Sequence, residues 1–324
     1  PMDMTTRAAT GSACAALRVV LTPISGMDSN RPQPPWFASQ PKTMGWNGLK
    51  CCAALPPAST APPISAASST GYQFEHRFND AWHFRQSDQA VSGRIGANYI
   101  FANGLAPYAS YGTSFLPQSG SDRHGKAFTP TRGEQYEIGV KFQPAGSKGL
   151  LTAALFDLTK QDVTTPDPVN RNFSVQTGEI RSRGLELEAR QELLPGLNLI
   201  AQYTLNDVKV SKSNDSDLGK TPLNTPRLMA SAWLDYSVQG GELRGLGGGL
   251  GARYRGDSYA DSANTVINPA HTLFDAALWY KRDAWTTRLN ISNLTDKDYI
   301  SSYAWSAAWQ GSRRTVNLSV NYRF

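Results

Sequence analysis

Apolar and polar residues alternate along the chain from Gly71 onward, segment after segment. In the last ten residues every second position is apolar and those between are polar, the apolar set being Val316, Leu318, Val320, Tyr322 and Phe324. The same period of two recurs in 185–190, 197–205, 250–255 and 288–291. Neighbouring side chains of a β-strand point to opposite faces, so this period predicts strands with one apolar and one polar face.

Short and long connections alternate between the predicted strands. Tight turns are expected at 102–104, 144–148, 194–196, 240–244 and 282–283, and longer polar loops near 117–130, 162–177, 212–225, 260–270 and 295–311. Short turns at one end and long loops at the other are typical of an up-and-down outer-membrane barrel. We therefore predict an all-β fold, an antiparallel transmembrane β-barrel of the outer-membrane type with about 11–13 strands.

A soluble β-sandwich is the alternative fold, because its strands alternate in the same way. Two features favour the barrel. Charged residues fall on one face of several predicted strands, as expected for a wet lumen, namely Glu137, Lys141, Asp235 and Asp275. Aromatic residues recur near strand ends, as in interfacial girdles, and these are Tyr108, Tyr111, Tyr254, Tyr259, Tyr280 and Trp285.

The amino-acid composition excludes some classes of protein and of binding partner. Of 324 residues, 32 are Lys or Arg and 26 are Asp or Glu, which gives a net charge of +6, and 40% are hydrophobic. This balance excludes a mostly disordered polyelectrolyte. The cations are scattered rather than clustered, so nucleic acid is not an expected partner. No apolar run is long enough for a transmembrane helix.

The first 70 residues differ from the rest. They are rich in Pro, Ala, Ser and Thr without a sustained period, so residues 1–70 are expected to be low-complexity or disordered and 71–324 to form the barrel. No export signal is visible in this segment. All three cysteines lie here, at Cys14, Cys51 and Cys52, without the spacing of a metal site or a disulfide framework.

No catalytic constellation is found. The four histidines are His76, His83, His124 and His271, and no G-x-S-x-G nucleophile motif accompanies them. We expect a protein that is not an enzyme, with no metal ligands and no cofactor of its own.

Several segments resemble, in order, the TonB-dependent ferric siderophore receptors of the ferrichrome type. The resemblance covers nearly all of 71–324 and is carried by GYQFEHRF (71–78), NYIFANGLAPYASYGTSF (98–115), QYEIGVKF (135–142), FSVQTGEIRSRGLELE (173–188), YRGDSYADSAN (254–264) and NLTDKDY (293–299). It implies a receptor in the outer membrane of a Gram-negative bacterium that imports a ferric hydroxamate siderophore with energy from the TonB complex. The iron would be carried by the siderophore.

The resemblance also implies parts that this sequence does not show. Transporters of this class close about 22 strands around a plug, and 71–324 is too short for that, so the resemblance implies that the barrel is partial here. Residues 1–70 contain neither the glycine-rich plug nor the TonB-contact segment, so we expect the plug to be absent and coupled transport to be impaired. A passive porin-like channel and a non-functional truncated gene product are the alternatives.

Candidate site residues follow from the same resemblance. The last external loop carries Tyr303, Trp305 and Trp309, which are expected to contact the siderophore or to anchor the loop at the membrane interface. Tyr111 and Phe115, at the outer end of a predicted strand, are weaker candidates for the same contact. The family ends in an aromatic residue that the barrel-assembly machinery reads. The matching set here is Phe324, Tyr322, Val320, Leu318 and Val316.

Overall fold

The computed structural model describes residues 68–78, 82–144, 146–304 and 307–323. Strands, turns and loops make up these segments. None of the described residues belongs to a helix long and apolar enough to cross a membrane. The predicted low-complexity region, residues 1–70, lies outside the described residues except for its last three.

One antiparallel sheet of eleven strands dominates the structure, in the spatial order β17-β14-β13-β10-β9-β8-β7-β6-β5-β4-β3. Its strands are β3 (Arg94–Asn98), β4 (Leu105–Leu116), β5 (Thr131–Phe142), β6 (Leu150–Pro166), β7 (Ser174–Leu194), β8 (Leu197–Lys212), β9 (Leu228–Ser237), β10 (Leu246–Arg255), β13 (His271–Arg282), β14 (Trp285–Ser292) and β17 (Thr315–Tyr322).

Three separate hairpins accompany the sheet. They are β1 (Ser68–Phe78) with β2 (Trp82–Ser92), β11 (Ser258–Tyr259) with β12 (Ile267–Asn268), and β15 (Ile300–Ala304) with β16 (Ala307–Gln310). The second and third hairpins lie inside long loops of the sheet. The sequence analysis had assigned those segments to loop, and their strands of two to five residues are too short for the period of two to be recognised.

Neighbours in the sheet are also neighbours in sequence, which confirms the up-and-down order. Short turns join β3–β4, β5–β6, β7–β8, β9–β10 and β13–β14 at one end, and the long loops join the strands at the other end. The loop expected at 162–177 is shorter than predicted, because the β6–β7 ladder continues through a bulge as far as the pair Pro166 and Ser174.

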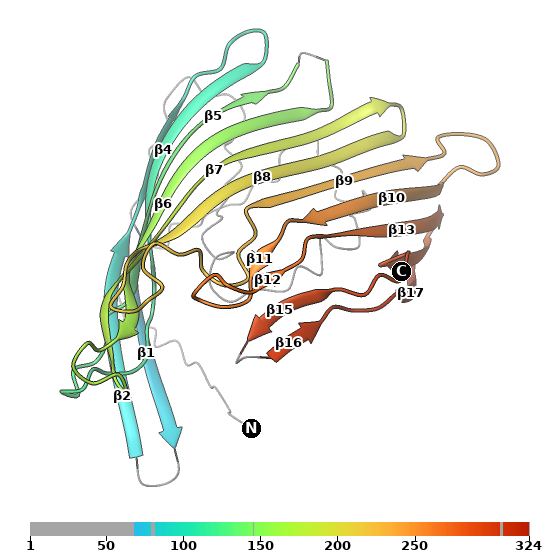
Figure 1. The fold of residues 1–324 in the computed structure, drawn as a ribbon. Helices are drawn as coiled ribbons and strands as arrows, with labels where there is room; N and C mark the ends of the chain where they lie inside the picture. Colours follow the sequence, from blue (N-terminus) through green and yellow to red (C-terminus); the bar gives the residue numbers. More distant parts are fainter. Residues whose placement is uncertain (1–67, 79–81, 145, 305–306, 324) are drawn as a thin grey trace.

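The sheet is curved and open. Figure 1 shows a trough in which β4 and β17 lie on opposite sides, and β3 and β17 are the edges of the hydrogen-bonded order. The described residues thus show the barrel wall that the alternation predicted, and it is partial, as the family resemblance implied. The expected lipid-facing and lumen-facing sides are both present.

The outer face is the apolar one. Ile138, Leu250 and Leu318 are 62%, 63% and 68% exposed, and register places Leu318, Leu289 and Leu278 side by side on β17, β14 and β13. The inner face carries buried and charged groups, including Trp233, Trp279 and Asp275. Exposed leucines on one side and buried carboxylates on the other are the reverse of a soluble domain and suit a wall between lipid and lumen.

The aromatic girdle is only partly as predicted. Trp285 and Tyr322 are in contact on the outer face beside the short turns, with tilted rings whose centroids are 4.7 Å apart. Tyr108, however, was wrongly assigned to the girdle. Its hydroxyl donates to Glu137 over 2.6 Å and its ring lies beneath Lys141, so it belongs to the inner wall. Tyr108 pairs with Gly139, which faces inward and leaves room for the Tyr108 ring. The ring therefore lies on the inner face of the sheet.

A stripe of glycines on β10 makes room for two tryptophans of the inner wall. Gly247, Gly249 and Gly251 face inward at alternate positions, with Trp279 over the first and Trp233 over the other two. Trp233 is fully buried and Trp279 is 3% exposed. The rings therefore lie against bare backbone, a packing that any larger residue at these positions would disturb.

Gly249→Ala should destabilise the folded sheet by about 1–3 kcal/mol, because its methyl carbon would lie 2.5 Å from the Trp233 ring. Gly240→Ala is the matched control, since nothing lies within 4 Å of its added carbon. The measurement is the urea midpoint of refolding into lipid vesicles for the complete protein. Equal midpoints for the two variants would contradict the proposed Gly–Trp packing.

Candidate functional site

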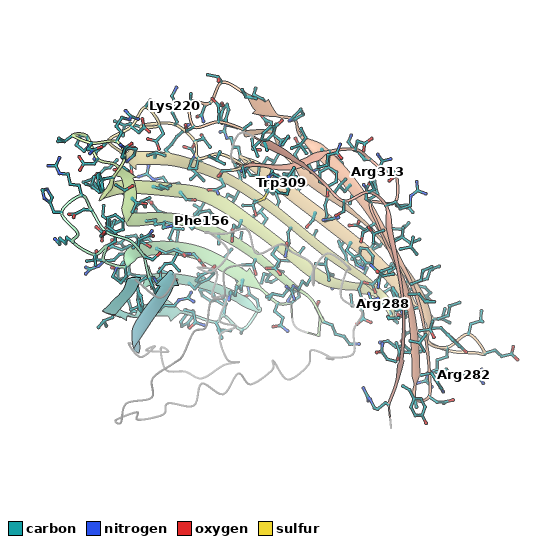
Figure 2. All side chains as sticks on the ribbon, turned by 90° about the horizontal axis from the view of Figure 1, so that it is seen from below. Phe156, Lys220, Arg282, Arg288, Trp309 and Arg313 are labelled. Carbon is teal, nitrogen blue, oxygen red and sulfur yellow. The ribbon has the colours of Figure 1, made fainter. Side chains whose placement is uncertain are left out.

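The long loops at one end of the sheet form a connected rim. Three of them, 213–227, 256–270 and 293–314, meet around the β15–β16 hairpin. Figure 2 places Trp309 and Arg313 in this region and Arg282 at the opposite, short-turn end. Because the strands are antiparallel and every second connection is long, all these loops lie at the same end of the strands.

Asn224 joins the first of these loops to the last. Its backbone is left-handed, with φ of 58°, and its side chain forms two hydrogen bonds with the backbone of Tyr303, each 2.7 Å long. Arg255, at the end of β10, donates to the carbonyl oxygens of Asn224 at 2.7 Å and Ser301 at 3.1 Å. One amide and one guanidinium thus fix the position of β15.

The middle loop is tied in by the same chemistry. The Asn264 side chain bonds both backbone groups of Thr221 at 2.8 Å, and Asn268 donates to the carbonyl of Ile300 at 3.3 Å. Side-chain amides that pair with backbone groups substitute for a β-ladder where the chain is irregular. The three loops are therefore one hydrogen-bonded unit.

The base of the last loop is held by a buried polar cluster. Asp275 is 1% exposed and receives a two-point contact from Arg253, with its shorter distance 2.7 Å. The same carboxylate accepts the backbone N–H of Asn293 at 2.9 Å. Asn293 is 2% exposed and bonds the carbonyls of Lys297 and Ser312. A buried carboxylate is stable here because each of its oxygens is paired.

A second, exposed cluster closes the neck of this loop. Arg313 pairs with Asp296 through two nitrogens, at 3.0 and 2.7 Å, and also contacts Asp298. The backbone N–H of Arg314 adds a third donor to Asp296 at 2.8 Å. The guanidinium of Arg313 is the main cause that lowers the pKa of the Asp296 carboxyl below its ordinary range.

Tyr299 packs between the last loop, 293–314, and strand β13. Its ring stacks on His271 with centroids 4.6 Å apart, and on the other side it lies against Gly311, where a methyl group would collide with the ring. His271 is only 9% exposed. The NLTDKDY segment thus supplies three anchors, Asn293, Asp296 and Tyr299, and together they set where the β15–β16 hairpin lies.

The chain matches the family model of the TonB dependent receptor-like β-barrel over residues 67–294. It belongs to that family. It is similar to the ferrichrome outer membrane transporter/phage receptor of Escherichia coli, 37% identical over 247 residues, which are 74% of this chain and 33% of the relative. The ferrioxamine receptor of Yersinia enterocolitica is 38% identical, again with 74% of this chain but 34% of the relative covered. The chain therefore spans about a third of these relatives.

Solved structures agree on the fold of this TonB-dependent receptor barrel. The siderophore receptor PiuA of Acinetobacter baumannii matches with a TM-score of 0.63 and 27% identity, over 78% of this chain and 39% of that one. The ferric preacinetobactin receptor BauA of the same species matches with a TM-score of 0.64 at 24% identity, over 79% and 39%. The outer membrane of Gram-negative bacteria is thus confirmed as the location.

The structure separates the predicted ligand contacts of this receptor barrel. Trp309 lies on β16, 58% exposed, and pairs with Ser302, whereas Tyr303 pairs with Ala308. The two aromatic side chains therefore project from opposite faces of the hairpin. Trp305, between them, lies outside the described residues. Contact of these residues with a ligand stays a prediction.

Tyr111 and Phe115 are not brought to this loop. Tyr111 stacks on Tyr136 at 4.8 Å, and Tyr136 is 57% exposed on the outer face. Phe115 lies four residues along the same strand and so on the same face. Both aromatics lie on the side that the barrel turns towards lipid, which favours an interfacial role over the predicted ligand contact.

The predicted barrel-assembly residues also share the outer face. Val316, Leu318, Val320 and Tyr322 are each about half exposed or more, at alternate positions of the edge strand β17. Phe324 lies outside the described residues. Their recognition by the assembly machinery stays a prediction.

Sequence reasoning missed Asn224, and it missed the role of Arg255 in connecting the loops. Asn224 follows a leucine in an irregular loop, and Arg255, although it lies in the YRGDSYADSAN segment, ends an ordinary strand. No group of three or more His, Cys, Asp or Glu among the described residues has the arrangement of a metal site. The contacts of the rim are hydrogen bonds, ion pairs and aromatic contacts.

Arg313→Gln should loosen the last loop, because it removes the pairing that holds Asp296 and Asp298. A protease that cleaves after aromatic residues should then cut the 300–310 segment faster. Arg282→Gln, at the short-turn end, is the control with the same loss of charge.

In the unsubstituted protein, the resistance of the 300–310 segment to the protease should be independent of pH from about 8 down to 4, near the ordinary Asp pKa. A carboxyl whose pKa is lower in the folded state than in the unfolded state stabilises the folded state at pH values above its unfolded pKa. This stabilisation is lost only as the pH falls towards the folded pKa. Rapid cleavage of the unsubstituted protein already at pH 5 would show that the Asp296–Arg313 pair does not anchor the loop.

Proposed function

We propose that this chain forms the C-terminal wall and outer rim of a receptor that imports ferric siderophores of the hydroxamate class, coupled to the TonB complex. The observation that carries the proposal is the identity of 37–38% to receptors named for ferrichrome and ferrioxamine. Relatives named for other chelates, such as the metal-pseudopaline receptor of Pseudomonas aeruginosa, are more distant at 33%.

The rim is suited to a bulky polar ligand. Its last loop is fixed from below by Asp275 and Asn293 and from the side by Asn224, while Trp309 stays exposed on it. A rigid aromatic side chain provides a large contact area with little loss of conformational entropy. The iron would be held by the chelator, so the protein would supply contacts rather than metal ligands, with no enzymatic step and no cofactor of its own.

The partners are proposed on the same basis. A TonB-dependent mechanism requires an energy-transducing contact that residues 68–323 do not include, and a plug that would lie within the trough. The Phe324 end is proposed to be read by the barrel-assembly machinery during insertion into the outer-membrane lipid. No feature of the described residues suggests binding of nucleic acid.

Uptake of iron by cells that produce the complete protein tests the function directly. We expect import of radiolabelled ferric ferrichrome or ferrioxamine B that stops when the TonB complex is removed. A ferric catecholate is the matched control and should not be imported. Import of all three chelates at one rate, unaffected by loss of TonB, would instead indicate a passive channel.

Trp309→Ala should weaken binding of the ferric hydroxamate to the complete protein by about 10-fold, the scale of a lost aromatic contact. Trp285→Ala, a similarly exposed tryptophan at the short-turn end, is the control and should leave the affinity unchanged. The measurement is the fluorescence quenching of the receptor during titration with the chelate. Unchanged affinity for Trp309→Ala would assign this side chain to the membrane interface.

A further inference from the structure

The ladder between β10 and β13 is interrupted beneath the last loop. Arg255 and His271 form its final pair. The chain pairs again three residues further on, where Ser258 lies opposite Asn268 in the β11–β12 hairpin. Pro269, within the interruption, has no backbone N–H with which to continue the ladder. The two pairs of side chains therefore flank a break in the wall, within about 10 Å of each other along the strands.

Three consecutive residues of the last loop, 299–301, cover this break. The first packs its ring against His271, with centroids 4.6 Å apart. The carbonyl of the second accepts a hydrogen bond from Nδ2 of Asn268 at 3.3 Å, and the carbonyl of the third accepts one from Nη1 of Arg255 at 3.1 Å. Consecutive Cα atoms are about 3.8 Å apart, so the three side chains beneath this segment lie close together.

Each side chain at the break keeps one buried polar atom that no described residue satisfies. Arg255 uses both terminal nitrogens on carbonyl oxygens, but its Nε has no partner in the described segments. The same holds for Oγ of Ser258, Oδ1 of Asn268 and Nδ1 of His271. These last three residues are only 4%, 2% and 9% exposed. Unpaired buried polar atoms are costly, so their gathering in one place indicates an occupant that bonds to them.

The chemistry of the four atoms restricts that occupant. The Nε–H of Arg255 can only donate. Oδ1 of Asn268 can only accept, because the amide nitrogen is turned towards the carbonyl of residue 300. Ser258 and His271 can each donate or accept. The occupant must therefore both donate and accept, which excludes a metal cation and a fully deprotonated anion. A water molecule, with two donors and two acceptors, satisfies all four atoms.

We propose that an ordered water site fills this break and joins the barrel wall to the last loop. The water accepts from Arg255 and donates to Asn268, and Ser258 and His271 complete its hydrogen bonds. It thereby fixes the inner atoms of the same side chains whose outer atoms hold segment 299–301. The site positions the loop from below and is separate from its exposed tip, so it does not depend on which chelate the receptor imports.

High-resolution diffraction from crystals of the complete protein without chelate tests the occupant directly. We expect a compact peak at about 2.7–3.2 Å from at least three of the four atoms, the number of bonds typical of a buried water. A planar or tetrahedral peak would overturn the proposal in favour of a protonated oxyanion. A break without any peak, with the side chains turned to bond one another, would overturn it as well.

A double-variant cycle tests whether the site holds the loop. Ser258→Ala and His271→Phe, which keeps a ring against Tyr299, should each raise the hydrogen-exchange rate of the backbone amides of 300–304 by about 10-fold, the scale of one lost hydrogen bond. Because both variants lose the same water, the double variant should exchange about as fast as either single one. Unchanged rates in the single variants, or a double variant near 100-fold, would refute a shared water.

Ser182→Ala is the matched control for these variants. This serine is 2% exposed, as buried as the residues at the break, but its hydroxyl is already bonded to Asn206 at 2.7 Å on β7 and β8. Its loss should leave exchange of 300–304 unchanged. Equal acceleration by Ser182→Ala and Ser258→Ala would indicate general loosening of the wall and would overturn the assignment. The diffraction test needs no variant, so it decides the proposal even where a substitution prevents folding.

Discussion

A strand within a bilayer has no water to satisfy its backbone, so both of its edges must be paired with other strands. The nine inner strands of the eleven-stranded sheet meet this requirement, and β3 and β17 do not. With an odd number of alternating strands, the two edges run in the same direction. Closing this sheet on itself would pair β3 with β17 in parallel, which up-and-down barrels avoid. The edges thus call for further strands, in keeping with the larger barrels that the chain matches over about two fifths of their length. This argues against a small independent channel made of the eleven strands alone.

The same pairing rule gives the two faces their different chemistry. Once the ladder is fixed, register alone decides what each side chain meets. On the outer face this produces continuous rows of leucine, alanine and valine that end at a charged row. On the inner face it places Trp233 and Trp279 over bare glycines and buries Asp275 beneath Arg253. The wall is thin, so its inner stability depends on flat rings against backbone rather than on a second layer of structure.

Much of the fold follows from the sequence, because a period of two and an alternation of short and long connections are local signals. The strands of the main sheet, their order and the barrel type were predicted from them, whereas the short hairpins within the loops and the open form of the sheet were not. The period of two could not show which face of the sheet a particular residue occupies. Tyr108 and Tyr111 are three residues apart, so they must lie on opposite faces. Only their pairing with Gly139 and Tyr136 shows that Tyr108 is the one that faces inward. The loops were harder still. The contacts of Asn224 with the β15–β16 hairpin join residues 79 apart, and no local pattern encodes a pairing at that distance.

The candidate site shows the same division between local and long-range information. The aromatic residues of the last loop were recognisable by type, but their exposure depends on anchors elsewhere: Asp275 on β13, Arg255 on β10 and Asn224 in a third loop. These anchors are short polar side chains that bond to backbone, so they hold position without occupying the surface that a ligand would meet. A rim built in this way separates two tasks. The buried polar groups determine where the loop lies, and the exposed tip is left free to vary with the ligand.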